Sequence, residues 1–163
     1  MTTDMTRRGL FARLRGGPTQ LRPPWSKPEH EFTEACTQCG GCIEVCPTGL
    51  LVKGHAGFPI ADFSYYSCTF CGACRDACVQ ECFRAADEAP WDLKAVANST
   101  CLEARGVSCR VCEDTCESAA IRFLLQPGGK ATPSITPSCT GCGACAARCP
   151  VQAISILPAD HQD

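Results

Sequence analysis

Residues 139–150 read Cys139-Thr140-Gly141-Cys142-Gly143-Ala144-Cys145-Ala146-Ala147-Arg148-Cys149-Pro150. Their four cysteines are separated by two, two and three residues, which gives the form C-x2-C-x2-C-x3-C. The same spacing occurs in two earlier groups, which begin at Cys36 and Cys68. A further group begins at Cys101 and keeps the last two spacings, but seven residues separate its first two cysteines. The chain therefore contains an internal repeat of four cysteine groups.

The groups are numbered in chain order and together hold all but one of the 17 cysteines. Group one is Cys36, Cys39, Cys42, Cys46; group two is Cys68, Cys71, Cys74, Cys78; group three is Cys101, Cys109, Cys112, Cys116; group four is Cys139, Cys142, Cys145, Cys149.

This spacing is typical of cysteines that bind 4Fe-4S clusters. Cysteines at every third position of a tightly turning loop can point three thiolates at one compact inorganic core, and the fourth, followed by proline, ligates the other cluster of a pair in two-cluster ferredoxins. Pro47 and Pro150 fit that pattern, whereas Val79 follows group two. The sequence predicts clusters but leaves open whether each takes its ligands from one group or crosswise from two.

Two other uses of cysteine fit less well. A disulfide scaffold of a small secreted protein is disfavoured by the odd number of cysteines and by the lack of a cleavable signal peptide. A structural zinc site uses two separated C-x2-C pairs, so it would leave the middle cysteine of each triple without a role. Three complete copies of the longer spacing favour iron and sulfur.

Group three and Cys82 each allow two interpretations. Group three holds a fourth cluster if its longer loop bulges outward and still delivers Cys101; otherwise it is a degenerate repeat with buried thiols. Cys82 lies four residues after Cys78, where the other groups place Leu50, Ala120 and Ala153. A free buried cysteine behaves as a small apolar side chain, so we expect Cys82 to pack rather than to ligate.

The composition indicates a protein that needs metal sites or other cross-links to stabilise its fold. Hydrophobic residues make up 45% of the 163 residues, but without the cysteines only about a third of the chain remains to form a core. Short chains with a poor core usually need covalent or metal cross-links. Alternating or apolar segments flank the cysteine groups and predict short strands. These segments are 48–52, 58–63, the stretch from Phe83, 120–124, 134–136 and 153–157.

The predicted fold class is therefore α+β, with tandem ferredoxin-like 4Fe-4S modules built of short strands and short helices. We expect a basic, irregular N-terminal tail over residues 1–30, a first module over 31–90 with groups one and two, and a second over 91–163 with groups three and four. Pro and Gly breaks in the first 30 residues favour a tail, although a short helix over residues 8–15 fits the sequence.

Charge and motif patterns exclude several functions. The net charge of −2 and the absence of interleaved basic and aromatic residues argue against nucleic-acid binding, and no apolar run is long enough to span a membrane. The sequence contains no Ser/His/Asp set, phosphate-binding loop or paired carboxylates that would indicate an enzyme. Residues 1–28 hold six basic side chains against one acidic, while the rest hold nine against sixteen. The tail arginines are therefore candidates for partner docking: Arg7, Arg8, Arg13 and Arg15.

The whole chain resembles the NapF family of ferredoxin-type proteins, which is encoded with periplasmic nitrate reductase. The resemblance runs through residues 7–9, 22–26, 89–93, the unusual third group at 101–116, and 139–151. The Arg-Pro-Pro-Trp stretch and the third group make it more specific than cysteine loops alone. Arg7-Arg8 also resembles a twin-arginine export signal. Such a signal needs an apolar stretch after the arginines, but the residues that follow here are charged. We therefore expect a cytoplasmic protein.

The resemblance implies a non-catalytic iron-sulfur protein that binds the catalytic subunit of the nitrate reductase before export and assists its maturation, by electron supply or cluster delivery. It implies three 4Fe-4S clusters, at groups one, two and four, and leaves a fourth at group three open. The alternative is a general electron-transfer ferredoxin, or a small electron-transfer subunit of a redox complex.

Overall fold

The computed structural model describes residues 20–126 and 128–159, and within them short helices alternate with short strands. The helical elements are α2 (Glu29–Ala35), α3 (Gly41–Glu44), η1 (His55–Gly57), α4 (Ala73–Asp76), η2 (Glu103–Arg105), α5 (Val111–Thr115) and α6 (Ala144–Arg148). The strands are β1 (Leu51–Lys53), β2 (Pro59–Ala61), β3 (Leu93–Ala97), β4 (Ile121–Leu125), β5 (Ala131–Ile135) and β6 (Ile154–Pro158). This is the α+β class that the sequence predicts.

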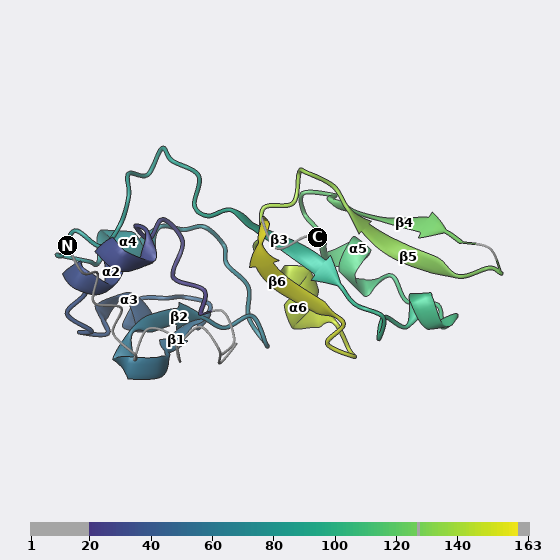
Figure 1. The fold of residues 1–163 in the computed structure, drawn as a ribbon, viewed down its shortest axis with the longest axis horizontal. Coiled ribbons are helices and arrows are strands. Elements are labelled where there is room, and N and C mark those ends of the chain that lie inside the picture. The colour runs from purple at the N-terminus through teal and green to yellow at the C-terminus, as the bar shows by residue number, and fades with distance from the viewer. Residues whose placement is uncertain (1–19, 127, 160–163) are drawn as a thin grey trace, which may run out of the picture.

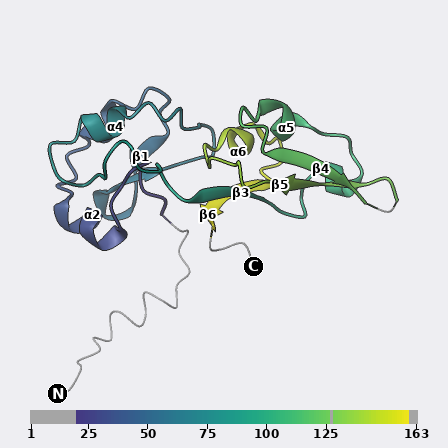
Figure 2. The ribbon, with the colours of Figure 1, turned by 90° about the horizontal axis from the view of Figure 1, so that it is seen from above.

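The elements form two lobes that lie side by side (Figure 1). The first lobe contains α2, α3, α4 and the antiparallel pair β1–β2; the second contains α5, α6 and the antiparallel pairs β3–β6 and β4–β5. The lobes remain separate in the perpendicular view, where the β4–β5 hairpin projects away from the first lobe (Figure 2). The module boundaries at residues 30 and 90 remain predictions.

The strands of the second lobe confirm the alternation seen in the sequence. In β4, Ile121 is buried and pairs with Ile135 of β5, while Arg122 is exposed. In β6, Ile154 and Ile156 are buried on either side of an exposed serine. Because side chains of a strand point alternately to opposite faces, one face of each pair enters the core.

The strand expected from Phe83 is wrong, because this stretch makes only an isolated antiparallel bridge between Phe83 and Ser26. Phe83 pairs with a residue of the segment 20–28 and not with the strand of a neighbouring hairpin, and the pairing does not extend beyond this bridge. Helix α2, which begins at Glu29 just after this segment, was not predicted from the sequence. Phe32 of this helix is fully buried.

Residues 20–28 of the predicted tail pack against the first lobe. Trp25 is 7% exposed, so its ring anchors this segment to the lobe. Its indole N–H donates to the Glu88 carbonyl at 2.9 Å, and Ala61 N–H donates to the Leu21 carbonyl at 2.7 Å. Residues 1–19, with the four docking arginines and the expected helix at 8–15, lie outside the described residues.

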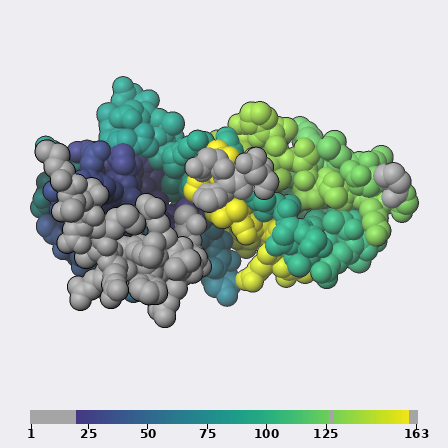
Figure 3. Space-filling view, in the orientation of Figure 1, coloured from purple at the N-terminus to yellow at the C-terminus, as the bar shows by residue number. Residues whose placement is uncertain are grey.

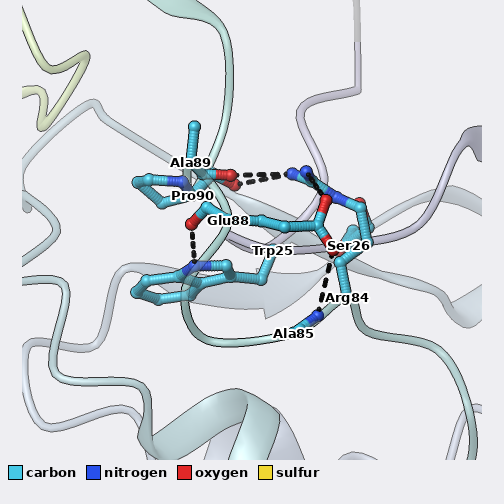
Figure 4. A network of polar contacts seen from close by, with 7 residues as sticks. All are labelled: Trp25, Ser26, Arg84, Ala85, Glu88, Ala89 and Pro90. Atoms are coloured by element: carbon cyan, nitrogen blue, oxygen red, sulfur yellow. Dashed lines mark hydrogen bonds and ion pairs between the residues drawn. The ribbon is translucent and has the colours of Figure 1, made fainter.

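A polar network around Arg84 fixes the loop that leads toward the second lobe (Figure 4). The Arg84 guanidinium donates to the Ser26 carbonyl at 3.1 Å and to the Ala89 carbonyl at 2.9 Å, and it forms an ion pair with Glu88 at 2.9 Å. These bonds hold the 84–90 loop against the N-terminal segment, beside the buried ring of Trp25.

The buried core runs through both lobes and contains cysteines as well as aliphatic residues. Leu51 and Phe63 of the first lobe and Leu93 and Ile156 of the second belong to one cluster of buried side chains. In the space-filling view, β6 reaches the surface between the lobes (Figure 3). Among the residues that the structure describes, no helix is both long and apolar enough to cross a bilayer.

Candidate metal centres

In groups one, two and four, the cysteine loop turns into the left-handed region on both sides of its second cysteine. The residue before that cysteine and the glycine after it have positive φ: Gln38 and Gly40, Phe70 and Gly72, Gly141 and Gly143. Gly40, Gly72 and Gly143 are the N-caps of the short helices that carry the third cysteines. Glycine adopts this conformation without strain, so the repeated Cys-Gly-x-Cys sequence lets the loop fold back and bring its first three cysteines together.

Three pockets each collect the first three cysteines of one group and the fourth cysteine of the paired group, and the lining of one of them also includes Cys82. Site A is lined by Cys36, Cys39, Cys42 and Cys78; site B by Cys68, Cys71, Cys74 and Cys46; site D by Cys139, Cys142, Cys145 and Cys116. Of the two arrangements that the sequence left open, the geometry therefore corresponds to the crosswise one.

The third cysteines of paired groups lie near each other between the sites. Burial, followed by the charges of Cys74 and Cys36, raises the pKa of Cys42 to about 11. Burial, followed by charges that include Cys142 and Cys112, raises the pKa of Cys145 to about 12. Several buried thiols that raise each other's pKa become thiolates together only when a positive partner offsets their charge. The donor set thus fits a cationic metal cluster.

The fourth cysteines of groups one and three have the opposite tendency. Burial would raise the pKa of Cys46, but bonds from the Leu51 N–H and from the hydroxyl and N–H of Thr48 lower it below its ordinary value. Burial would also raise the pKa of Cys116. Hydrogen bonds from the Ser118 hydroxyl and the Ala120 N–H outweigh this effect, so the pKa of Cys116 is also lowered.

The two hydroxyls lie at equivalent positions in the repeat. Thr48 Oγ1 is 3.6 Å from Cys46 Sγ, and Ser118 Oγ is 3.4 Å from Cys116 Sγ. The sequence interpretation missed both residues. The available signal was the alignment of groups one and three, in which a hydroxyl residue follows two positions after the fourth cysteine.

Group three also gathers its cysteines, despite its long first spacing. Burial and the charges of Cys101 and Cys109 raise the pKa of Cys112 to about 11. The inserted residues turn through η2, where Glu103 accepts a hydrogen bond from the Cys109 N–H at 2.7 Å. The insertion therefore folds back onto the loop. We call Cys101, Cys109 and Cys112 site C; Cys149 is its crosswise candidate, because it follows α6, which packs against α5.

Cys82 packs beside site A. It is 1% exposed and lines the same pocket as Cys36 and Cys78. The three residues at equivalent positions, Leu50, Ala120 and Ala153, are at most 2% exposed. The predicted apolar packing position is confirmed in all four repeats. That Cys82 does not ligate a cluster stays a prediction.

The shape of the sites suits a cluster better than one ion. Within residues 20–126 and 128–159, no three His, Cys, Asp or Glu side chains gather closely enough for a single metal ion. A zinc site would need sulfurs about 2.3 Å from one centre. Sites A, B and D instead each line one pocket with four cysteines from two groups, and such a set can bind a multi-atom core without converging on one point.

Comparisons with known proteins agree with this geometry. The family model described as "4Fe-4S dicluster domain" matches residues 33–87 and 105–153. The chain is 40% identical over 157 residues to the ferredoxin-type protein NapF of Escherichia coli (strain K12), covering 95% of this chain and 96% of the relative. It is 48% identical over 137 residues to the ferredoxin-type protein NapF of Haemophilus influenzae, covering 83% and 78%.

A more distant relative is the methylamine utilization ferredoxin-type protein MauM of Methylophilus methylotrophus, 31% identical over 159 residues, or 85% of this chain and 70% of that protein. The two domain matches each include a pair of cysteine groups, although the second begins after Cys101. They confirm the predicted cofactor class, multiple 4Fe-4S clusters. The chain belongs to the family of ferredoxin-type NapF proteins, iron-sulfur proteins built from 4Fe-4S dicluster domains.

Proposed function

We propose that the chain holds four 4Fe-4S clusters, each bound by the first three cysteines of one group and the fourth cysteine of the paired group. The observation that supports this most directly is the crosswise lining of three pockets. The ligands are Cys36, Cys39, Cys42 and Cys78 at site A; Cys68, Cys71, Cys74 and Cys46 at site B; Cys101, Cys109, Cys112 and Cys149 at site C; Cys139, Cys142, Cys145 and Cys116 at site D.

The fourth cluster goes beyond the three that the resemblance implies. Its support is the return of the long loop of group three onto Cys109 through Glu103 at 2.7 Å, together with the proximity of Cys101 and Cys109 to Cys112. Cys149 is the fourth cysteine left over once sites A, B and D are assigned. Iron and acid-labile sulfide, counted per chain after anaerobic purification, distinguish four clusters from three.

We further propose that the protein is a non-catalytic, cytoplasmic factor that assists maturation of the catalytic subunit of periplasmic nitrate reductase before export. The support is the similarity to a NapF protein over 95% of this chain, together with the association with periplasmic nitrate reductase that the resemblance implies. A general electron-transfer ferredoxin, or an electron-transfer subunit of a redox complex, is the alternative.

Of the two routes to maturation, crosswise ligation favours electron supply. Each cluster would be held by two separate loops, so its release would require both loops to open. A cluster that stays in place can still gain and lose one electron without any bond being made or broken. Cluster delivery is therefore the outcome against which electron supply is tested.

The first experiment is an anaerobic pull-down of tagged protein from nitrate-respiring cells, probed for the precursor and the exported form of the catalytic subunit. Recovery of the precursor alone is expected. Recovery of neither form, by a brown protein with intact clusters, would leave the general ferredoxin as the function.

The second experiment mixes the protein, loaded with ⁵⁷Fe, with the iron-free precursor. Electron supply predicts that the label stays on the donor, whereas delivery predicts its transfer. The exposed-surface variant Tyr65→Ala serves as a matched control for handling losses, because Tyr65 is 75% exposed and lies in no cysteine group.

A further inference from the structure

The two lobes meet where the cysteine loop of site B lies against that of site D. The Cys68 N–H donates to the Cys142 carbonyl at 2.8 Å. Cys68 belongs to group two and Cys142 to group four, so the bond joins residues 74 positions apart in the chain. One backbone hydrogen bond thus connects a cysteine of site B directly to a cysteine of site D.

An aromatic cluster surrounds this contact. The Trp91 ring packs edge-on against Phe63, with centroids 5.7 Å apart, and against Phe70, with centroids 5.6 Å apart. Its indole N–H donates to the Thr140 carbonyl in the loop of site D at 2.9 Å. Phe70 in turn donates its N–H to Cys68 Sγ at 3.3 Å. Trp91 therefore contacts the loops of both sites.

The loop of site D is packed too closely against its neighbours to accept side chains at its glycines. A Cβ on Gly143 would overlap the Phe63 ring, and one on Gly141 would meet the Leu93 carbonyl. Both glycines are buried. This close approach keeps the loop of site D next to Trp91 and the loop of site B, so the contact between the lobes is built by packing and not by one hydrogen bond alone.

Inside each lobe, the sites also adjoin. Helix α3, which carries Cys42 of site A, packs against α4, which carries Cys74 of site B. Helix α5, which carries Cys112 of site C, packs against α6, which carries Cys145 of site D. The four sites therefore follow one another through the molecule in the order A, B, D, C, which differs from their order in the sequence.

We propose that the chain conducts electrons along its length, and that the contact of Cys68, Cys142 and Trp91 is the step that joins its two halves. This inference rests on the proposed ligand sets. In this step one electron leaves the cluster at site B, which is oxidised from 1+ to 2+, and enters that at site D, which is reduced from 2+ to 1+. No proton moves and no bond changes. A low-potential one-electron donor of the ferredoxin or flavodoxin class reduces one end, and a one-electron acceptor is reduced at the other.

A cation already lies at the receiving side of the junction. Lys94 Nζ donates to the Pro137 carbonyl at 3.0 Å and to the Cys139 carbonyl, beside the first cysteine of site D. A positive charge there favours the more negative, reduced state of site D. The contact is thus suited to pass electrons from the first lobe to the second.

The test isolates sites B and D and measures whether they interact. The variant C39A/C109A removes one ligand from each outer site, so that B and D carry the remaining signal. After iron and sulfide are counted, the fully reduced protein is examined by EPR for spin–spin broadening. Trp91→Ala opens the junction without changing a proposed ligand, and Tyr65→Ala removes an exposed aromatic ring elsewhere as the matched control.

We expect the signals of B and D to broaden each other in C39A/C109A, to stay broadened when Tyr65→Ala is added, and to lose the broadening when Trp91→Ala is added. Hydrogen exchange at the Cys68 amide should also accelerate in Trp91→Ala. Two intact centres with sharp, independent signals would overturn the junction while leaving the ligand sets intact. Sites B and D that take up no iron would instead show that the ligand sets fail, and the junction with them.

A second measurement avoids the double variant if C39A/C109A does not fold. The full chain is reduced, and its spin relaxation is compared between Trp91→Ala and Tyr65→Ala. Slower relaxation in Trp91→Ala alone is expected. Equal relaxation in both variants, at equal iron content, would overturn the junction.

Discussion

Two hydroxyl groups distinguish the inner sites from the outer ones at the scale of single residues. Thr48 and Ser118 lie beside the sulfurs of Cys46 and Cys116, the crosswise cysteines of sites B and D. At the equivalent position the outer sites have Gln80 and Val151. Hydrogen bonds to cluster sulfurs raise the reduction potential because they stabilise the added negative charge. Sites B and D should therefore be reduced more easily than sites A and C.

Removing either hydroxyl should lower the reduction potential of one cluster. A hydrogen bond worth about 1 kcal/mol corresponds to about 40 mV in a one-electron couple. We expect a fall of this size in Thr48→Val for site B and in Ser118→Ala for site D, measured by EPR-monitored redox titration. Thr33→Val and Ser138→Ala are matched controls, because their hydroxyls bond to Glu29 and Thr136 instead of sulfur. A shift in the controls as large as in the variants would contradict the assignment.

Cys82 provides a second test at this scale, because it is the one cysteine that we expect not to ligate. Cys82→Ala should keep all iron and lose only about 1 kcal/mol of unfolding free energy, since a buried sulfur is replaced by a small cavity. Cys78→Ala, four residues earlier, should lose the cluster at site A. Iron counting and anaerobic denaturant unfolding check both. Equal iron loss in the two variants would make Cys82 a ligand.

The repeat alone predicted that Leu50, Cys82, Ala120 and Ala153 pack inside, because each follows its group by four residues, and all four are buried. The hydroxyls of Thr48 and Ser118 were not predicted, because their bonds depend on side-chain rotamers and on how paired groups face each other. Spacing fixes which residues approach a site; it does not fix which atoms point at the sulfurs.

At the scale of elements, pairing between distant segments was the part that the sequence left undetermined. The strands predicted over 120–124 and 153–157 have a local alternation of apolar and polar residues, and they form as β4 and β6. The stretch from Phe83 was also predicted to be a strand, but it forms only an isolated bridge with Ser26, 57 residues earlier in the chain. Helix α2 contains only seven residues and buries only Phe32, so its periodicity is too weak to be recognised.

Arg84 should stabilise the 84–90 loop, because its charged guanidinium donates hydrogen bonds to the backbone carbonyls of Ser26 and Ala89. Arg84→Met keeps much of the aliphatic side chain but removes the donors to Ser26 and Ala89. We expect a loss of about 1 to 2 kcal/mol, since Arg84 is partly exposed. Anaerobic denaturant unfolding, followed by tryptophan fluorescence, measures this loss. Arg148→Met, at an exposed position of α6, is the control; similar losses in both would show that the network contributes nothing specific.

At the scale of the whole molecule, charge separates the N-terminal segment from the rest. Residues 1–28 are strongly basic, whereas the rest of the chain is acidic before any cluster is counted. Four thiolates around a dicationic core add about two negative charges per site, so the loaded protein is more acidic still. An acidic body repels acidic partners, and the basic segment is then the part of the chain that can attract them.

Replacing Arg7, Arg8, Arg13 and Arg15 with alanine should weaken binding of the proposed partner, the precursor of the nitrate reductase catalytic subunit, mainly at low salt. Exposed charges are screened beyond about 10 Å at 0.1 M ionic strength, so wild type and variant should converge as salt rises. Affinity measured anaerobically across a salt series tests this. A second variant with lysine at the same four positions keeps the charge and should bind like wild type. Unchanged affinity of the alanine variant at low salt would rule out a docking role for this charge, and loss of binding in the lysine variant would mean that guanidinium geometry matters rather than charge.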